Sequence, residues 1–441
     1  MPPIEPSNNP VNSVTTTTKT GYFSRIGSSI KGIFFGFLIF IASFVVLYWN
    51  EGKVDKSDIA STAVEISASS SNTDASLENK LVHLNGDLVT DSKISDSTYL
   101  QENNYLVLNR KVEVYAWVEE SSSKTKTNVG GSQTTDTTYT YKKDWVAEAP
   151  DSSSFQEQKG HENVDKTLDS NTWYASIAKV GVYEVEPAKL TMPGFVEIAL
   201  TKENTILPVV TVPTTTKKVV PQNDLMKALS ASDEDLAAEF QKDIVSTVAE
   251  VVEPEKVKNV VLNGNYIYVA EKNVSTPTVG DMRISYSAVT SPVTVTLLGR
   301  LNGNKITAMT DAKTGVTLYR AFNGTFEDAL GTLHKEYKTA LWIFRVIGFL
   351  MMWIGLAMVL APLSVLLDVL PIFGTISRSV VGLVTFLVAL VLSIVTIVVS
   401  MVLHNPLVLI LVIIAVGIYV FKLVKKAKQK NTNLNINSQK S

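Results

Sequence analysis

The longest stretch of the chain without a charged residue runs from Ser379 to Phe421 and covers 43 residues. A helix needs about 20 apolar residues to cross a bilayer, so this run predicts two membrane spans joined by a tight turn. Pro406 supports a break there, because proline disfavours a helical conformation in the residue before it. Buried helices of a soluble protein would not need so long an uncharged run, and we therefore expect a membrane protein.

Two more uncharged runs, residues 32–50 and 346–367, raise the predicted number of transmembrane helices to four, one N-terminal and three C-terminal. The first could instead be a cleaved signal peptide. It begins after some 30 residues, lacks an Ala-x-Ala cleavage site and is followed directly by Trp49-Asn50-Glu51-Gly52. Signal peptides have a shorter apolar core and a small-residue exit, so an uncleaved signal anchor is favoured.

The charges are divided between two parts of the 441-residue chain, whose net charge is only −2. Outside residues 51–340 there are 11 basic and 2 acidic residues, a balance of +9, whereas residues 51–340 carry 29 basic and 40 acidic residues, a balance of −11. Basic residues flank the first and last spans, which places both termini in the cytoplasm and the acidic domain in the periplasm or lumen. The Lys-rich tail after residue 421 is best explained as an orientation signal that also attracts anionic lipid, and not as a nucleic-acid site.

The domain between the first two spans is predicted to be mostly β. Apolar and polar residues alternate over 106–118 and again over 139–145, which predicts a long hairpin. Residues 121–137 between them are rich in Ser, Thr, Gly and Asn and are predicted to form a flexible loop. Asn263-Gly264 and Asn302-Gly303 each separate two apolar runs and predict two more hairpins. Further strands are expected at 81–84, 181–186, 194–200, 206–212 and 282–287.

Two polar segments and two helix starts complete the outline. Residues 1–20 and 67–76 have the composition of disordered or linker segments, which cannot bury a core. A helix is predicted over 232–252. A second helix start at Thr325, with Asp328 three residues later, predicts a helical stalk that continues into the second span.

The sequence carries no strong catalytic signature. The glycine-rich nucleotide-binding motifs, H-E-x-x-H and G-x-S-x-G are all absent. The absence of cysteine excludes disulfides, Cys-ligated zinc and thiol nucleophiles, and the four histidines are scattered, so neither a metal nor a cofactor is expected. His161 is the one candidate general base, because it lies beside Glu162 in a polar loop. A surface loop is the preferred interpretation, and a tethered extracytoplasmic enzyme with hydrolase-like activity on lipid or envelope substrates is the alternative.

The predicted spans argue against transport, because an ion path needs ionisable groups within the membrane and only Arg345 and Asp368 come near it. A channel would instead require a polar path between the last three spans. Four glycines could let the helices pack closely, which favours a structural bundle or an oligomer interface. They are Gly348, Gly355, Gly382 and Gly417.

Several motifs in this order resemble the transmembrane protein 43 family, also called LUMA. They begin with Trp49-Asn50-Glu51-Gly52 after the first span and Leu81 to Leu84 on an early strand. The others lie at 110–119, 139–145, 160–163 and 279–285. The positions singled out, whose role is unknown, are Trp49, Asn50, Glu51, Gly52, Arg110, Trp117, Trp145, Gly160, His161, Asn163, Gly280, Asp281 and Arg283. The resemblance covers nearly the whole chain outside residues 1–25 and the C-terminal tail, and it is weakest over 200–255.

The resemblance implies a non-enzymatic membrane scaffold that self-associates. In animals such proteins are associated with the endoplasmic reticulum and inner nuclear membrane, and with partners such as emerin and lamins. The Asn-, Lys- and Thr-rich, cysteine-free composition suits a bacterial member in the inner membrane, which has no lamina to bind. We therefore expect an α+β membrane protein whose partners are the lipid bilayer and further copies of the chain. The predicted segments are 1–31 (disordered, basic), 32–50 (first span), 51–80 (linker), 81–324 (β-rich domain), 325–340 (stalk), 341–367, 379–403 and 406–421 (spans), and 422–441 (basic tail).

Overall fold

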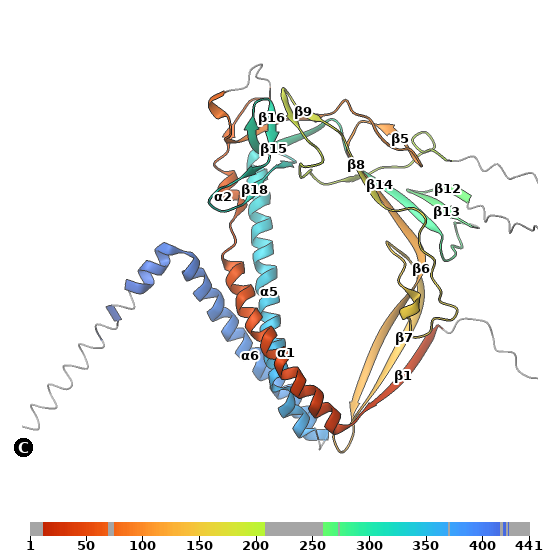
Figure 1. The fold of residues 1–441 in the computed structure, drawn as a ribbon, viewed down its shortest axis with the longest axis vertical. Helices are drawn as coiled ribbons and strands as arrows, with labels where there is room; N and C mark the ends of the chain where they lie inside the picture. The colour runs from red at the N-terminus through yellow and green to blue at the C-terminus, as the bar shows by residue number, and fades with distance from the viewer. Residues whose placement is uncertain are drawn as a thin grey trace, which may run out of the picture.

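The structure is a computed structural model that describes residues 12–68, 75–207, 259–271, 274–368, 371–414, 418, 419 and 422. It has three parts, namely a small β-barrel, a long twisted sheet and a bundle of helices (Figure 1). The predicted helix over 232–252, the basic tail beyond residue 422 and most of the predicted strand 206–212 lie outside the described residues.

Five strands close into the barrel, because β15 pairs with β16 on one side and with β3 on the other, and β10 and β9 complete the circle. Its interior is filled by apolar side chains such as Leu84, Val180 and Leu297, all fully buried. The predicted turn at Asn302-Gly303 is confirmed between β15 and β16. The barrel strands are β3 (Leu81–Val89), β9 (Ala178–Val180), β10 (Tyr183–Val185), β15 (Val293–Asn302) and β16 (Lys305–Thr307), with β2 (Val64–Glu65) and β19 (Arg320–Phe322) at its edges.

The long sheet has the order β1-β7-β6-β14-β13-β12 and packs its own apolar core around Leu108, Ile267 and Ile284. The predicted hairpin at Asn263-Gly264 is confirmed between β12 and β13. The strands are β1 (Ser13–Thr20), β6 (Tyr105–Thr127), β7 (Gln133–Val146), β12 (Asn259–Asn263), β13 (Tyr266–Ala270) and β14 (Met282–Thr290), with β8 (Asn171–Tyr174) on β6 and β11 (Val196–Glu197) on β14. Two small hairpins lie apart, β4 (Ile94–Asp96) with β5 (Leu100–Asn103) and β17 (Met309–Thr310) with β18 (Thr317–Leu318).

Beyond Trp117 the sheet narrows to three strands, β1, β7 and the segment of β6 from Glu119 to Thr127, which we call the ribbon. Two sequence predictions are wrong here. Residues 121–137 are not a loop, because β6 runs to Thr127 and β7 begins at Gln133, and residues 13–20 are not disordered, because β1 pairs with β7 along its whole length. Threonine is β-branched and favours strands, and its hydroxyl groups pair across the ladder. The pairs are Ser123–Thr137 and Thr125–Thr135 at 2.9 Å, Thr15–Thr138 at 3.0 Å and Thr17–Asp136 at 2.6 Å.

The described part of the chain contains three helices long and apolar enough to cross a membrane. These three candidate spans overlap α1 (Tyr22–Glu51), α5 (Phe326–Leu367) and α6 (Pro371–His404). The short helix α2 (Lys56–Ala60) follows α1. The predicted helix start at Thr325 is confirmed, because Thr325 and Asp328 form a reciprocal capping box. Residues 406–414 are helical after a break at Asn405, and the continuously described part of this segment is about 14 Å long, so the fourth span remains a prediction.

Close helix packing occurs at two of the four predicted glycines. A Cβ on Gly348 would lie 2.5 Å from Leu47, and one on Gly355 would lie 2.7 Å from the backbone nitrogen of Phe40. A Cβ on Gly382 would have no neighbour within 4 Å, and Gly417 lies outside the described residues. Glycine thus lets α5 approach α1, while α6 packs without such help at Gly382.

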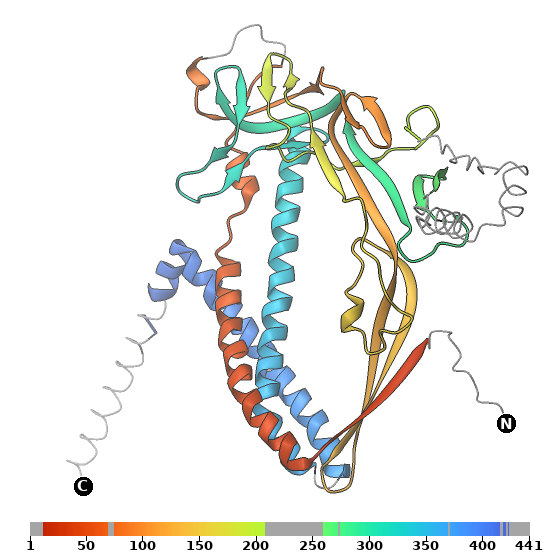
Figure 2. The same ribbon diagram turned by 45° about the vertical axis from the view of Figure 1, so that its right-hand side comes forward.

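The ribbon and the helices are two arms that leave the barrel end of the molecule and meet again at the opposite end (Figures 1 and 2). The first turns of α5 pack on the barrel through Ala329 and Leu333, and the rest of α5 packs along α1. β1 leads directly into α1 at Gly21, where the two arms join. The turn of the β6–β7 hairpin therefore lies at the end of the helices farthest from the barrel.

Candidate functional site

Arg25 joins three distant segments at the far end of the molecule. Its guanidinium donates hydrogen bonds to the carbonyl oxygen of Gly131 in the hairpin turn and to the carboxylate of Asp368, the residue that caps α5. Arg25 and Asp368 are both buried. Gly131 has φ of 78°, and a Cβ there would lie 2.5 Å from the ring of Tyr22. No pattern in the sequence indicated this joint, because its members are brought together only by the complete fold.

The motif after the first span ties the helices together at the barrel side of the bundle. The amide of Asn50 donates to the carbonyl oxygen of Leu341 at 2.9 Å, and Arg345 donates two hydrogen bonds of 2.8 Å to the Glu51 carboxylate. A Cβ on Gly52 would lie 2.5 Å from the ring of His404 at the end of α6. Trp49, in contrast, is 70% exposed. Three of the four motif residues thus hold α1 against α5 and α6.

His161 is fully buried against the upper part of the ribbon. Its ring stacks on Tyr141 with centroids 3.9 Å apart and meets the edge of Trp117 at 4.7 Å. Nδ1 lies 2.9 Å from the carbonyl oxygen of Glu157, whereas Nε2 has no hydrogen-bond partner among the described residues. The neighbouring Glu162 turns away and accepts hydrogen bonds from the backbone of Gly160. The sequence placed His161 on a surface loop, and this is wrong for its side chain, because the aromatic residues enclose it.

Asn163 fastens the same loop to β6. Its side chain accepts a hydrogen bond from the backbone nitrogen of Trp117 at 2.7 Å and donates one to the carbonyl oxygen of Trp117 at 2.9 Å. The amide therefore takes the place of a neighbouring strand at that position. Tyr141 adds a second link, because its hydroxyl donates to Glu119 at 2.7 Å; burial and this hydrogen bond raise the pKa of Tyr141 to about 12.

Arg110 belongs to a buried polar cluster in the long sheet. It donates to the Asp96 carboxylate at 2.6 Å and to the backbone oxygen of Asp169, and Tyr286 donates to the same Asp96 oxygen at 2.5 Å. Burial alone would raise the pKa of Asp96. The hydrogen bonds from Tyr286 and Arg110 lower this pKa by more than burial raises it, so it lies below its ordinary value. Asp96 thus stays ionised and holds β4 on β6 and β14.

Arg283 lies on the other face of the sheet. It donates to Glu113 at 2.7 Å and lies over the ring of Trp145 at 4.9 Å, so two motif positions come together. Burial raises the pKa of Glu113, but the hydrogen bonds from Arg283 and Lys111 lower it below its ordinary value.

The motif pair Gly280-Asp281 forms the turn before β14. Asp281 is fully buried, and its carboxylate accepts hydrogen bonds from the backbone nitrogens of Glu271 at 2.9 Å and Thr278 at 2.7 Å. The backbone nitrogen of Gly280, at φ of 92°, donates to the carbonyl oxygen of Tyr115 on β6. These two residues therefore shape a turn and connect it to the sheet.

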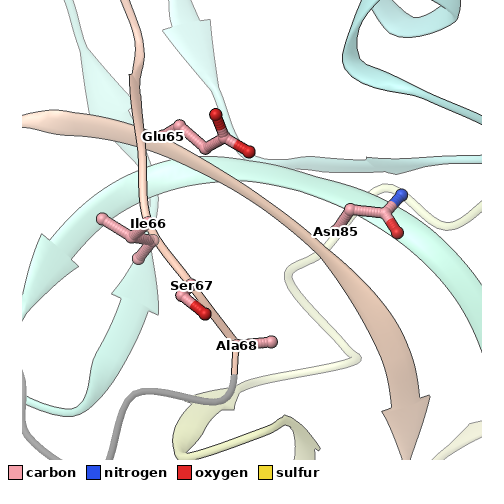
Figure 3. Close-up of a pocket in the computed structure, with 5 residues that line it drawn as sticks. All are labelled: Glu65, Ile66, Ser67, Ala68 and Asn85. Carbon is pink, nitrogen blue, oxygen red and sulfur yellow. The ribbon is translucent and has the colours of Figure 1, made fainter.

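An open hollow of about 580 Å³ lies at the barrel edge and is lined by Glu65, Ile66, Ser67, Ala68 and Asn85 (Figure 3). The amide of Asn85 is already engaged with the hydroxyl of Thr296 at 3.1 Å. Glu65 is the one titratable residue of this lining, and none of the motif residues reaches it. In the part of the chain that the structure describes, no three His, Asp or Glu side chains gather in a way that could hold a metal ion.

Known proteins of one family match most of this chain. A family model described as Transmembrane protein 43 matches residues 114–406. The chain belongs to the transmembrane protein 43 family. Transmembrane protein 43 of Mus musculus and of Homo sapiens are each 25% identical to it over 410 residues, covering 89% of this chain and 90% of theirs. The Transmembrane protein 43 homolog of Drosophila melanogaster is 22% identical over 387 residues, 85% of this chain and 89% of its own. No solved structure matches the chain.

Within this transmembrane protein 43 fold, the motif residues form joints. They connect the loop over His161 to the ribbon, β14 to β6, and α1 to α5 and α6. The sequence did not indicate that Asp96 and Arg345 complete these joints, and it missed the joint at Arg25 altogether. Alternation placed Tyr141 and Tyr286 on strands, but no local pattern indicates which charges they meet.

Proposed function

We propose that this protein is a non-catalytic, multi-pass membrane scaffold. One observation carries the proposal: apart from the exposed Trp49, the charged and aromatic motif residues are engaged in contacts between elements of the same chain, as at Arg110, His161 and Arg283. An enzyme would need some of these groups to face a substrate. The ring of His161 is enclosed, which supports a packing role over a general base.

A rigid connection between the barrel and the membrane also supports a scaffold. α5 is one continuous helix from its cap at Thr325 to Leu367, about 63 Å in length, and its first turns are buried against the barrel. Such a helix holds the barrel at a fixed height above the bilayer. The barrel and the upper sheet would then present a binding surface to other envelope proteins.

For the orientation, we propose that both termini are cytoplasmic and that the barrel is periplasmic or lumenal. Lys19, Arg25 and Lys31 lie at or near the start of α1, and the hairpin turn beside them carries Lys124 and Lys126 on its approaching strand. Basic residues collect on the cytoplasmic side of membrane proteins. The composition favours a bacterial inner membrane, and the endoplasmic reticulum or inner nuclear membrane would be the location in a eukaryote.

The test is chemical cross-linking in intact membranes of the source organism, followed by affinity purification of a tagged chain and identification of the attached proteins and lipids. We expect species heavier than one chain and a reproducible set of membrane proteins that an unrelated four-span protein does not capture. A strictly monomeric protein without partners would contradict the scaffold. Turnover of a lipid or envelope substrate that is lost in His161→Ala but kept in a folded control would point to the enzyme instead.

A further inference from the structure

The ribbon extends along the same depth as the membrane helices. Its β6 segment from Glu119 to Thr127 is about 30 Å long, which is close to the thickness of the hydrocarbon core of a bilayer. In both views it lies at the same level as α1, α5 and α6, apart from them near the barrel, and it meets them at its tip (Figures 1 and 2), where Arg25 binds Gly131. The helices expose apolar side chains over this depth, among them Phe37, Ile354 and Val391. A polar ribbon therefore accompanies apolar helices through the same layer.

The two faces of the ribbon differ in charge. Successive side chains of a strand point to opposite faces, so the strand register places Lys124, Asp136 and Thr17 together on one face and Ser123, Thr137 and Thr16 on the other. The first face holds all the charges of the ribbon below Glu119. They are Lys19, Glu120, Lys124, Lys126 and Asp136. Glu120 forms an ion pair of 2.6 Å with Lys142, which lies on the same face opposite Val118. The second face has only hydroxyl, amide and apolar groups from Ser121 to Thr127 and in the residues opposite them.

The charged face points away from the helices. Tyr141 lies on the same face as Ser121 and Ser123, opposite Glu119 and just above the charge-free part, and His161 stacks on it. The loop that carries His161 and η2 (Ser152–Ser154) lies on the helix side of the ribbon, drawn in gold in Figures 1 and 2. The charge-free face is thus turned toward the membrane helices, and the lysines and acidic residues are turned outward, where they need water.

Both edges of the ribbon are open. β14 pairs with β6 only as far as Val114, and Asn163 covers Trp117. From Ser121 to Thr127, β6 has β7 as its single neighbouring strand within the described part of the chain, and β1 likewise has β7 on one side only. At membrane depth an unpaired backbone group costs several kcal/mol, and open sheet edges do not face lipid. The edges require either water or another strand.

We propose that the open β6 edge of one copy pairs in parallel with the β1 edge of the next copy. Repetition of this contact closes a ring in which the ribbons form the inner wall. The charged faces then surround a water-filled space, and the helices of each copy lie outside in lipid. This inference rests on the proposed membrane placement and specifies how the scaffold assembles.

Strand direction and face charge select this pairing over contacts between like edges. β1 and β6 are both antiparallel to β7, so they run in the same direction within one copy. Copies with the same orientation in the membrane can therefore join β6 to β1 with all charged faces on one side. A two-fold contact of β6 with β6 would place the charged face of one copy beside the charge-free face of the other. A head-to-tail interface that closes by rotation gives a ring.

Disulfide trapping tests the interface, because the natural chain has no cysteine. Thr16 and Ser123 both lie opposite Thr137, one on each side of β7, so within one chain they are about 9.6 Å apart. A disulfide requires Cα atoms within about 7 Å, so Thr16→Cys with Ser123→Cys can bridge only between copies. Pairing Thr16→Cys in turn with Ser121→Cys, Ser123→Cys and Thr125→Cys covers the possible registers.

Oxidation of these double variants in intact membranes is expected to give a ladder of dimers and larger species in at least one register. Thr16→Cys alone and Ser123→Cys alone should stay monomeric, and Thr17→Cys with Ser123→Cys, on opposite faces, should cross-link at least tenfold less. Thermal unfolding in detergent checks that each variant folds like the natural chain.

A dimer from Ser123→Cys alone would overturn the proposal, because it indicates contact between like edges. If no register cross-links while a lysine-reactive reagent still yields multimers, the scaffold stands and the ribbon interface is wrong. If both reagents give only monomers, the scaffold and the interface are contradicted together.

Discussion

Arg25, in the first turns of α1, and Asp368, at the end of α5, form a buried ion pair although 343 positions separate them in the sequence. The same guanidinium binds the carbonyl oxygen of Gly131. A single side chain therefore closes the helix bundle and holds the tip of the ribbon. A buried charge that loses its partner is costly, so this pair is a sensitive point of the fold.

Removal of the guanidinium should release the hairpin tip. Arg25→Met removes the buried guanidinium that binds the Asp368 carboxylate, and we expect a loss of about 3–5 kcal/mol in the free energy of unfolding. Trypsin should then cut faster after Lys124 and Lys126, which lie on the approaching strand. The double variant Arg25→Met/Asp368→Leu should recover part of the stability, since no lone charge remains. If the natural chain and Arg25→Met had the same free energy of unfolding, the stabilising role of the Arg25 joint would be contradicted.

Gly355 allows α5 to approach α1. A Cβ there would lie 2.7 Å from the backbone nitrogen of Phe40 and 2.8 Å from the carbonyl oxygen of Gly36, and neither backbone atom can move aside alone. Gly355→Ala should cost about 1–3 kcal/mol through overpacking. Gly382→Ala is the matched control, because a Cβ there would have nothing within 4 Å. Thermal unfolding in one detergent compares the two, and an equal effect of both would argue against close packing.

His161 should be replaceable by an aromatic residue of similar size. Its ring packs between Tyr141 and Trp117, and among the described residues only Nδ1 has a hydrogen-bond partner, the carbonyl oxygen of Glu157. His161→Phe should cost about 1 kcal/mol for that hydrogen bond, whereas His161→Ala should cost about 3 kcal/mol because it leaves a cavity. Denaturant unfolding measures both. A phenylalanine variant as unstable as the alanine variant would show that the imidazole is needed for more than packing.

Asp96 should make stability fall in acid. Its folded-state pKa is lowered, so its contribution is complete above the unfolded-state pKa of about 4 and is lost as pH falls through the folded-state value. Asp96→Asn should be less stable at pH 7 and should lose less stability between pH 5 and pH 3. Glu102→Gln removes an exposed partner of Lys93 and serves as the control, with a change below about 0.5 kcal/mol. If the free energy of unfolding falls equally between pH 5 and pH 3 in Asp96→Asn and in the natural chain, this role of Asp96 is contradicted.

Elements with a strong local signal were predictable from the sequence. The uncharged runs indicated α1, α5 and α6, the Asn-Gly pairs marked two hairpin turns, and Thr325 with Asp328 marked the start of α5. Each of these signals lies within a single helix or turn. There the spacing of apolar residues, the turn residues or the capping residues decide the local conformation.

The ribbon was not predictable in the same way, because its stability depends on pairing between distant segments. Thr15 and Thr138 are 123 positions apart, and each alone lies in a polar run typical of a loop. The barrel also depends on distant segments, since its closure needs β3 to meet β15.

For the candidate site, the sequence singled out His161, but its burial follows from Tyr141 and Trp117, which only the folded hairpin brings to it.

The position of the ribbon tip relative to the barrel is the central claim, and the cysteine-free chain allows a direct test. Val129→Cys places a thiol at the hairpin turn, where the natural side chain is 83% exposed, and Asn304→Cys places one at an exposed turn of the barrel. A membrane-impermeant maleimide is applied to sealed vesicles of each orientation. The thiol at position 129 should be labelled from the side of the N-terminus and the thiol at position 304 from the opposite side. Labelling of both thiols from one side would contradict a ribbon that runs through the depth of the membrane.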